Sequence, residues 1–239
     1  MKILIFTQKV DKTDPVLGFF HSWIVEFSKQ FDSVEVVCLE KGKFDLPINV
    51  NVYSLGKPQY QSEARYGAGK FFQKIKYILN LYKYLFLISG SYDRVFVHMN
   101  EEYVLLCGLY WKIKGTPVYF WRNHSKGSIW THIAVILSSK VFCTSSDSFT
   151  ARFKKTSIMP AGIDTTIFKP LEGIVRKKYS ICMVGRISPV KHIDLGLEAF
   201  QALVSSGTQA SLAIIGPTFP NDKEYLEGLK KYVEDKNLS

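Results

Sequence analysis

Short apolar runs rich in β-branched and aromatic residues alternate with longer segments of helical periodicity along most of the 239 residues. Strands that are apolar on both faces are typical of parallel sheets covered by helices on each side. The alternation therefore predicts an α/β chain with a Rossmann-like, doubly wound parallel sheet. The predicted strands of the first part are Lys2–Phe6, Val34–Leu39, Val50–Tyr53, Arg94–His98, Val118–Trp121, Val141–Thr144 and Ser157–Met159. Its predicted helices are Phe19–Gln30, Lys70–Leu87, Glu102–Lys114, Ser128–Ser138 and Ser148–Lys154.

The segment Pro160–Pro170 interrupts this alternation. It predicts an interdomain linker, because two prolines and Gly162 fall within it. The alternation then restarts with strand Tyr179–Val184, helix His192–Val204, strand Ser211–Ile215 and helix Lys223–Asp235. We expect an N-terminal domain with its linker over residues 1–170 and the first part of a second Rossmann-like domain over residues 171–239.

Charge and composition narrow the function classes. The formal net charge is +10, and residues 1–170 hold 22 basic and 13 acidic side chains, which predicts an anionic partner for the first domain. The four cysteines show no CxxC spacing, so buried thiols in the cytosol are expected rather than disulfides or a zinc ribbon. Because the N-terminus lacks a signal-peptide pattern and the apolar runs are too short to span a bilayer, we expect a soluble cytoplasmic protein.

Lysines alternate with aromatic and aliphatic residues in the predicted helix at residues 70–88, at Lys70, Lys74, Lys76 and Lys83. This composition is typical of a helix lying on an anionic membrane surface, which would place the protein peripherally on the cytoplasmic face of the membrane. An ordinary covering helix with a solvated basic stripe has the same pattern, and this alternative stays open. Single-stranded nucleic acid is a third interpretation. Since no RNP, KH or helix-turn-helix pattern is present, we expect no nucleic-acid partner.

Polar residues and one glycine follow several predicted strands of the first domain, at Asp14, Gly18, His21, His98, Asn100 and His124. Ligands of parallel sheets bind beyond the carboxyl ends of the strands, so these positions predict one side of a ligand cleft. Structural interpretations stay open, since Gly18 can serve only to turn the chain and the histidines can pack against the core. No GxGxxG, GxSxG or metal-ligand spacing accompanies these residues. Neither a dinucleotide cofactor, a hydrolytic triad nor a metal ion is therefore expected.

The segment 184–191 follows a predicted strand and precedes a predicted helix. Ser188 suits the N-cap and Pro189 the first helical position, which places Lys191 in the first turn. A cation at this positive helix end is unfavourable unless an anion binds there. We therefore expect Arg186 and Lys191 to bracket an anion, with a solvated surface lysine as the alternative.

These features together resemble the retaining GT-B glycosyltransferases of family 4, the glycosyltransferase group 1 proteins. The residues that carry the resemblance are the linker Gly162-Ile163-Asp164 with Phe168 and Pro170, the motif Gly185-Arg186…Pro189…Lys191, Asp194, and Glu198-Ala199-Phe200. The likeness extends over nearly the whole chain. It implies a GT-B fold with an acceptor-side N-terminal domain and a nucleotide-sugar-binding C-terminal domain.

The resemblance implies an enzyme that transfers a sugar from a nucleotide-sugar donor to a saccharide or glycolipid acceptor of the cell envelope. The donor is a co-substrate, and neither a further cofactor nor a metal is expected. Arg186 and Lys191 would bind the donor diphosphate together with Gly18, and His124 would be the catalytic-site histidine near the donor sugar. The acceptor side would be lined by Asp14, His21 and Asn100.

Two positions depart from the family pattern. His192 stands where the family has glycine after Lys191, and no two glutamates have the spacing of the family's E-x7-E donor motif. We therefore expect a chain truncated in its C-terminal domain, with little activity by itself. The alternative function is a non-catalytic membrane- or acceptor-binding subunit that completes its site with a partner chain.

Overall fold

The computed structural model describes residues 1–58, 68–175 and 177–238, with the backbone alone at 68–70. The chain divides into two compact units, Met1–Asp164 and Thr165–Ser239. The division falls within the segment Pro160–Pro170, where the sequence predicts a linker.

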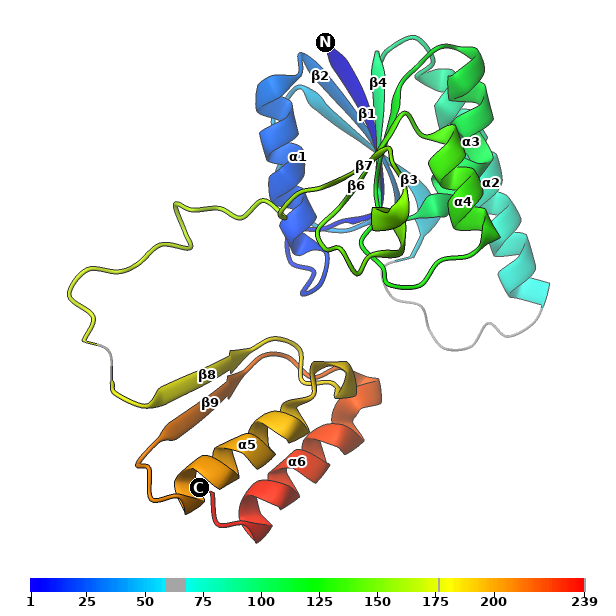
Figure 1. The fold of residues 1–239 in the computed structure, drawn as a ribbon. Helices are drawn as coiled ribbons and strands as arrows, with labels where there is room; N and C mark the ends of the chain where they lie inside the picture. Colours follow the sequence, from blue (N-terminus) through cyan, green and yellow to red (C-terminus); the bar gives the residue numbers. More distant parts are fainter. Residues whose placement is uncertain (59–67, 176, 239) are drawn as a thin grey trace. The chain divides into compact units, whose positions relative to one another are not determined.

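The first unit is built on seven parallel strands in the order β3-β2-β1-β4-β5-β6-β7 (Figure 1). The strands are β1 (Lys2–Val10), β2 (Ser33–Lys41), β3 (Val50–Lys57), β4 (Arg94–His98), β5 (Val118–Trp121), β6 (Lys140–Cys143) and β7 (Thr156–Ile158). The helices are α1 (Gly18–Gln30), α2 (Ala68–Leu87), α3 (Glu101–Ile113) and α4 (Ile129–Leu137). Helix α1 covers one face of the sheet, and α2, α3 and α4 cover the other. The predicted doubly wound parallel sheet is confirmed.

Alternate residues of β1 fill two separate core layers, because successive side chains of a strand point to opposite faces. Leu4 and Phe6 pack on the side of α2, α3 and α4, where the Phe6 ring centroid lies 5.4 Å from that of Trp111. Ile3 and Ile5 pack on the side of α1. All five side chains are buried, so β1 is the strand on which both layers are built.

The strand order reverses at β1. Ile5 of this strand lies opposite Val36 in β2 on one side and Phe96 in β4 on the other. Ligands of open α/β sheets bind at such a reversal, beyond the carboxyl ends of the strands. The loops after β1 and β4 therefore flank the expected ligand position.

The predicted elements of the first unit are confirmed apart from small shifts at their ends, with one exception. The helix predicted over Ser148–Lys154 is only a 3-10 turn, η1 (Phe149–Arg152). The hydroxyl groups of Ser148 and Thr150 donate to the carbonyl oxygen of Arg122, at 3.3 and 3.0 Å. Short polar side chains that bind backbone in this way compete with helix formation.

Three of the four cysteines are buried, and the prediction of buried thiols is wrong for Cys182, which is exposed. Cys38 lies in the α1 layer of the core and Cys107 in the opposite layer. Burial raises the pKa of both thiols to about 12, so neither ionises at neutral pH. Cys38, Cys107 and Cys143 act as small apolar side chains of the core.

The second unit contains a pair of parallel strands and two helices. These elements are β8 (Ser180–Val184), β9 (Ser211–Ile215), α5 (Ile193–Ser205) and α6 (Lys223–Asp235), with 3-10 turns η2 (Pro189–Lys191) and η3 (Pro220–Asp222) before the helices. Ile193, Leu197 and Leu229 form its small core. Val184 and Ile215, which are paired at the ends of the two strands, stay 80% and 55% exposed. The predicted strand–helix–strand–helix order is confirmed.

Candidate functional site

The loop between β1 and α1 is held by charges around Lys9. The Lys9 ammonium lies 2.7 Å from Glu40, 2.9 Å from Asp14 and 3.5 Å from Asp11. Burial opposes protonation of this largely enclosed side chain, but the hydrogen bonds to Glu40 and Asp14 outweigh burial and raise the pKa of Lys9. Lys9 therefore stays charged at neutral pH and anchors the loop that carries Asp14 and leads into α1, where Gly18 and His21 lie.

Both carboxylate oxygens of Asp14 are engaged within this loop. Oδ1 accepts hydrogen bonds from the N–H groups of Val16 and Leu17, at 2.9 and 2.8 Å, and Oδ2 pairs with Lys9. Burial alone would raise the pKa of Asp14, but these partners together lower it. The observed contacts are those of a turn-forming residue, and contact of Asp14 with an acceptor stays a prediction.

Gly18 is the first residue of α1, and its N–H donates to the carbonyl oxygen of Asp14 at 3.0 Å. A Cβ atom at this position would lie 3.3 Å from the carbonyl oxygen of Lys12, a tight contact with backbone. Glycine therefore lets the helix start pack on the preceding loop. Contact with a donor phosphate stays a prediction for Gly18.

His21 lies in the first turn of α1 and joins this helix to the segment after β2. Its Nε2 accepts a hydrogen bond from the N–H of Asp45 at 3.2 Å. Burial lowers the pKa of His21, which favours the neutral ring that this hydrogen bond requires. The acceptor-side role of His21 stays a prediction.

An aromatic cluster closes the carboxyl end of β4. His98 is 2% exposed and stacks on Phe20, with ring centroids 4.0 Å apart, and its Nδ1 lies 3.3 Å from Thr7 Oγ1. The rings of Phe19 and Trp23 pack edge-on against His98. Burial lowers the pKa of His98 to about 4, so the ring is neutral and serves the core.

The backbone turns sharply directly after His98. Met99 has a φ of 67°, and the N–H of Asn100 donates at 2.8 Å to the carbonyl oxygen of His98, two residues back, in the pattern of a γ-turn. Such conformations are strained for a residue other than glycine and are concentrated at ligand sites. Asn100 is the N-cap residue of α3, but its side chain makes no capping hydrogen bond. The structure thus places Asn100 at a strained strand end beside the reversal of the sheet.

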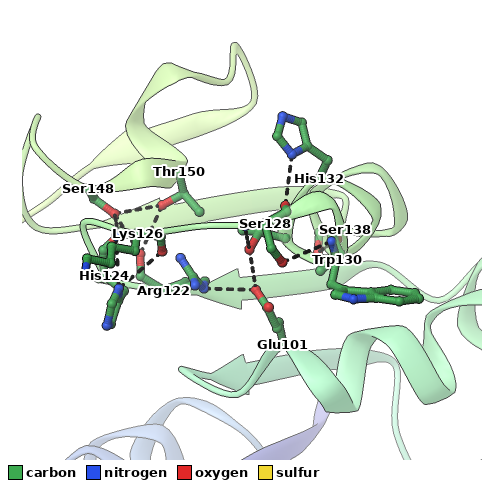
Figure 2. A network of polar contacts seen from close by, with 12 residues as sticks. Glu101, Arg122, His124, Lys126, Ser128, Trp130, His132, Ser138, Ser148 and Thr150 are labelled. Atoms are coloured by element: carbon green, nitrogen blue, oxygen red, sulfur yellow. Dashed lines mark hydrogen bonds and ion pairs between the residues drawn. The ribbon is translucent and has the colours of Figure 1, made fainter.

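Figure 2 shows His124 in the loop between β5 and α4. The N–H of Lys126 donates to His124 Nδ1 at 3.0 Å, and the Lys126 carbonyl oxygen lies 3.2 Å from the same nitrogen. Nδ1 is therefore engaged by the Lys126 backbone. The side chain is exposed, and no residue of the described ranges forms a hydrogen bond with Nε2. The loop therefore presents Nε2 to a ligand.

The His124 loop is fastened to the turn η1. The carbonyl oxygen of His124 accepts a hydrogen bond from the Phe149 N–H at 2.9 Å. Gly127 packs against the Phe149 ring so closely that a Cβ atom there would overlap it. The carbonyl oxygen of Arg122 accepts from Thr150 Oγ1 at the start of the same loop.

An ion pair that the sequence analysis missed joins α3 to this loop. Arg122 Nε lies 3.1 Å from Glu101 Oε2, which also accepts a hydrogen bond from Thr131 Oγ1 at 2.7 Å (Figure 2). Arg122 Nη1 is buried and has no hydrogen-bond partner within the described residues. Arg122 follows β5 directly, and this position at a carboxyl strand end was the signal available in the sequence.

In the second unit, a cavity of about 160 Å³ lies at the carboxyl end of β8. It is lined by Met183, Val184, Gly185, Arg186, Lys191 and Ile193. The Arg186 guanidinium lies 5.4 Å from the centroid of the Phe219 ring, a cation–π contact that orients it. The structure thus brings the two predicted cations to one cavity beside a glycine backbone, an arrangement suited to an anion.

Helix α5 lies within one residue of the predicted His192–Val204 at each end, but the expectation that Ser188 and Pro189 start this helix is wrong. They open the 3-10 turn η2 instead, and Ser188 Oγ is buried without a hydrogen bond to any described residue. Helix α5 begins at Ile193, and its N-cap is His192, with a left-handed φ of 49°. The left-handed residue turns the chain between η2 and α5, so Lys191 lies before the helix and not in its first turn.

Gly216, directly after β9, supports the backbone beside the same cavity. A Cβ atom on Gly216 would overlap the carbonyl oxygen of Gly185. The Gly185 N–H donates to Ile215 and the Ile187 N–H to Pro217, both at 2.9 Å. The end of β9 therefore holds the backbone that precedes the two cations.

No set of three or more His, Cys, Asp or Glu side chains within the described ranges is arranged to hold a metal ion. The carboxylates of Asp14 and Glu40 are engaged in ion pairs with Lys9.

Residues 164–239 match the family model of glycosyl transferases group 1. No curated protein matches the sequence. Among solved structures, sucrose-phosphate synthase from Thermosynechococcus elongatus superposes with a TM-score of 0.62 at 13% identity, covering 100% of this chain and 68% of that one. The catalytic domain of starch synthase IV from Arabidopsis thaliana, bound to ADP and acarbose, gives 0.61 at 12% identity, covering 98% and 72%.

The E. coli trehalose-6-phosphate protein bound with UDP-2-fluoro glucose gives a TM-score of 0.61 at 12% identity, covering 99% of this chain and 69% of that one. At such identities the likeness concerns the fold alone. With the parallel sheet of the first unit, it confirms the expected α/β fold of GT-B type with Rossmann-like units.

Replacing His98 by phenylalanine tests whether this ring is neutral in the core. Because the folded-state pKa of about 4 lies below the ordinary 6.5, the unfolded state takes up the proton first as the pH falls. The stability due to the neutral ring is complete above pH 6.5 and is lost as the pH falls from 6.5 to 4, by about 3 kcal/mol. Between pH 6.5 and 4, we expect the free energy of unfolding in urea to fall by about 3 kcal/mol more for the wild type than for His98→Phe. Equal pH dependence in the two proteins would contradict the assignment.

Replacing His192 by glycine tests the left-handed turn before α5. Glycine adopts a positive φ without the steric cost of a Cβ atom, so His192→Gly should raise the free energy of unfolding of the second unit by about 1 kcal/mol. The control is His192→Ala, which also removes the imidazole but keeps the Cβ atom and should give no gain. A gain of equal size in both variants would assign the effect to the lost ring.

Proposed function

We propose that the chain forms the acceptor-side domain and the beginning of the donor-side domain of a retaining glycosyltransferase of family 4 type. The observation that carries this proposal is the joint position of Arg186 and Lys191 on one cavity, within the segment that matches the glycosyl transferases group 1 model. The donor is a nucleotide-sugar, and the acceptor is a saccharide or glycolipid. The GT-B fold supports this assignment.

Arg186 and Lys191 act on the donor diphosphate. During transfer, the bond between the anomeric carbon and the diphosphate oxygen breaks, a bond from the acceptor oxygen to that carbon forms, and the proton of the acceptor hydroxyl passes to the departing diphosphate. Negative charge grows on the departing diphosphate as the sugar gains oxocarbenium character. Two fixed cations therefore stabilise the transition state more than the bound substrate. The cation–π contact with Phe219 keeps the Arg186 guanidinium at this position.

His124 acts beside the donor sugar. Its Nδ1 is occupied by the Lys126 N–H, so its Nε2–H is the group that donates to a sugar hydroxyl or a developing charge. The ion pair of Arg122 with Glu101 and the contacts with η1 hold the loop that carries this ring. We place Gly18 on the donor side and Asp14, His21 and Asn100 on the acceptor side. In the structure Asp14 and Gly18 already make contacts within the β1–α1 loop, and His21 contacts Asp45 in the segment after β2.

A glycolipid acceptor of the cell envelope would place the reaction at a membrane surface. The lysines of α2, with no acidic residue in that helix, support a peripheral contact with anionic lipid on the cytoplasmic side. We include this contact in the proposal.

Arg186→Ala and Lys191→Ala test the cavity in the second unit. Loss of one charge-assisted contact should raise the dissociation constant of UDP or ADP about tenfold or more, measured by calorimetry on this chain. In a sugar-transfer assay of the protein that contains these residues, kcat should fall roughly 10²-fold. The matched control is Lys230→Ala on α6, where the lysine is paired with Glu227 away from the cavity. Unchanged nucleotide affinity in both cavity variants would refute the donor assignment.

His124→Asn and His124→Ala separate catalysis from loop structure. The asparagine Oδ1 can accept the Lys126 N–H in place of Nδ1, but it supplies no Nε2–H group. If Nε2–H acts in the reaction, both variants should lower kcat by about 10² with little change in donor KM. Normal turnover in His124→Asn with loss in His124→Ala would mean that the ring only shapes the loop.

A further inference from the structure

The outer face of helices α2, α3 and α4 exposes an unusual number of apolar side chains. On α2, Phe72, Ile75, Leu79 and Phe86 are 67%, 37%, 64% and 62% exposed. Their spacings of three, four and seven residues place them in one stripe along the helix. The opposite side of α2 carries Leu81 and Leu85, which are buried in the core, so the stripe faces away from the sheet.

The neighbouring helices extend this apolar surface. Leu109 and Ile113 of α3 are 61% and 78% exposed, and Ile129 and Ile136 of α4 are 65% and 63% exposed. Helix α2 contacts α3 through a hydrogen bond from the Tyr82 hydroxyl to the Leu106 carbonyl oxygen at 3.0 Å. Helices α3 and α4 pack closely where Gly108 of α3 meets Leu137 of α4. The three helices thus form one layer on the same face of the sheet (Figure 1), and each of them carries exposed apolar side chains. We call this surface the outer helix face.

Lysines border the apolar stripe of α2. Lys76 and Lys83, seven residues apart, lie along one edge of the stripe, judged from their positions on the helix, whereas Lys74 lies seven residues before the buried Leu81, on the side of the helix that faces the sheet. Lys112 occupies the last turn of α3. The acidic residues of these helices are Glu101, which is paired with Arg122, and Glu102 in the first turn of α3. The charge of the face is therefore positive along α2 and at the end of α3.

We propose that the outer helix face docks on an anionic lipid bilayer, with the apolar stripes entering the headgroup region and the lysines contacting lipid phosphates. Apolar residues bordered by lysines suit a membrane interface, because the lysine stems cover apolar surface while their ammonium groups reach the headgroups. Exposed apolar patches rimmed by polar residues mark interaction sites, membrane contacts among them. No helix within the described residues is both long and apolar enough to cross a bilayer, so docking is at the surface.

A second copy of the chain fits this face less well. In a two-fold symmetric contact the same surface meets itself, so the lysines of one α2 would approach those of the other without acidic partners. An anionic bilayer supplies the opposite charge over the whole face. The membrane contact included in the proposed function is thereby assigned to the exposed residues of α2, α3 and α4. This contact does not depend on sugar transfer.

Vesicle co-sedimentation of this chain tests the proposal without donor or acceptor. We expect binding to vesicles of phosphatidylcholine with phosphatidylglycerol, weakening as salt is raised, and little binding to pure phosphatidylcholine. Each lysine near an anionic surface strengthens partitioning roughly fivefold, so Lys76→Glu with Lys83→Glu should weaken it about 25-fold or more. Phe72→Ser with Leu79→Ser should weaken it about tenfold through loss of apolar insertion.

The matched control is Lys29→Glu with Lys43→Glu, an equal change of charge on exposed residues of the α1 side, which should alter partitioning little. Far-UV circular dichroism and the free energy of unfolding verify that each variant is folded. Equal losses in control and test variants, or no vesicle binding by the wild type, would overturn the proposal. A dimer in analytical ultracentrifugation would also overturn the proposal if Phe72→Ser with Leu79→Ser abolished the dimer while vesicle binding persisted. Displacement of the protein from vesicles by a single-stranded oligonucleotide would overturn it as well. UDP binding to the same variants is unaffected in every case, so the two proposals fail separately.

Discussion

The parallel pairing of β1 with β2 on one side and β4 on the other is the constraint on which the first unit depends. Because every strand of this sheet runs in the same direction, each connection must cross back over a face, and the helices cover both faces. All carboxyl strand ends then lie along one edge. The strained turn at Met99, the charge cluster of Lys9 and the His124 loop are found at such ends for this reason.

Local patterns in the sequence predicted the elements well and tertiary contacts poorly. Apolar runs located the strands, since strands buried on both faces must be apolar, and Arg94–His98 and Val118–Trp121 have the predicted bounds. The left-handed turn at His192 separates η2 from α5 and takes Lys191 out of the helix, and no propensity rule assigns a positive φ to histidine. The cations of the second unit are five residues apart, so their shared cavity was predictable. The pairing of Arg122 with Glu101 joins separate elements and required the structure.

The lysines of the first unit are of two kinds, those paired with carboxylates inside the fold and those with no acidic residue in their own helix. Lys9 is enclosed by carboxylates from the loop and from β2, so its charge is used within the fold and adds little to the field outside. The lysines of α2 have no acidic neighbour in their own helix, and their charge is available to a partner. Net charge alone could not separate these groups, because it counts neutralised and available lysines alike.

The fastening of the His124 loop to η1 has a mechanical consequence. The carbonyl oxygen of His124 is bound to the Phe149 N–H, and Gly127 leaves no room against the Phe149 ring, so neither segment can shift alone. A shift of the loop alone would break the hydrogen bond to Phe149, so the 149–152 turn must move together with it for this contact to survive. The backbone that carries the imidazole is thus tied to the connection between β6 and β7 as well as to the end of β5.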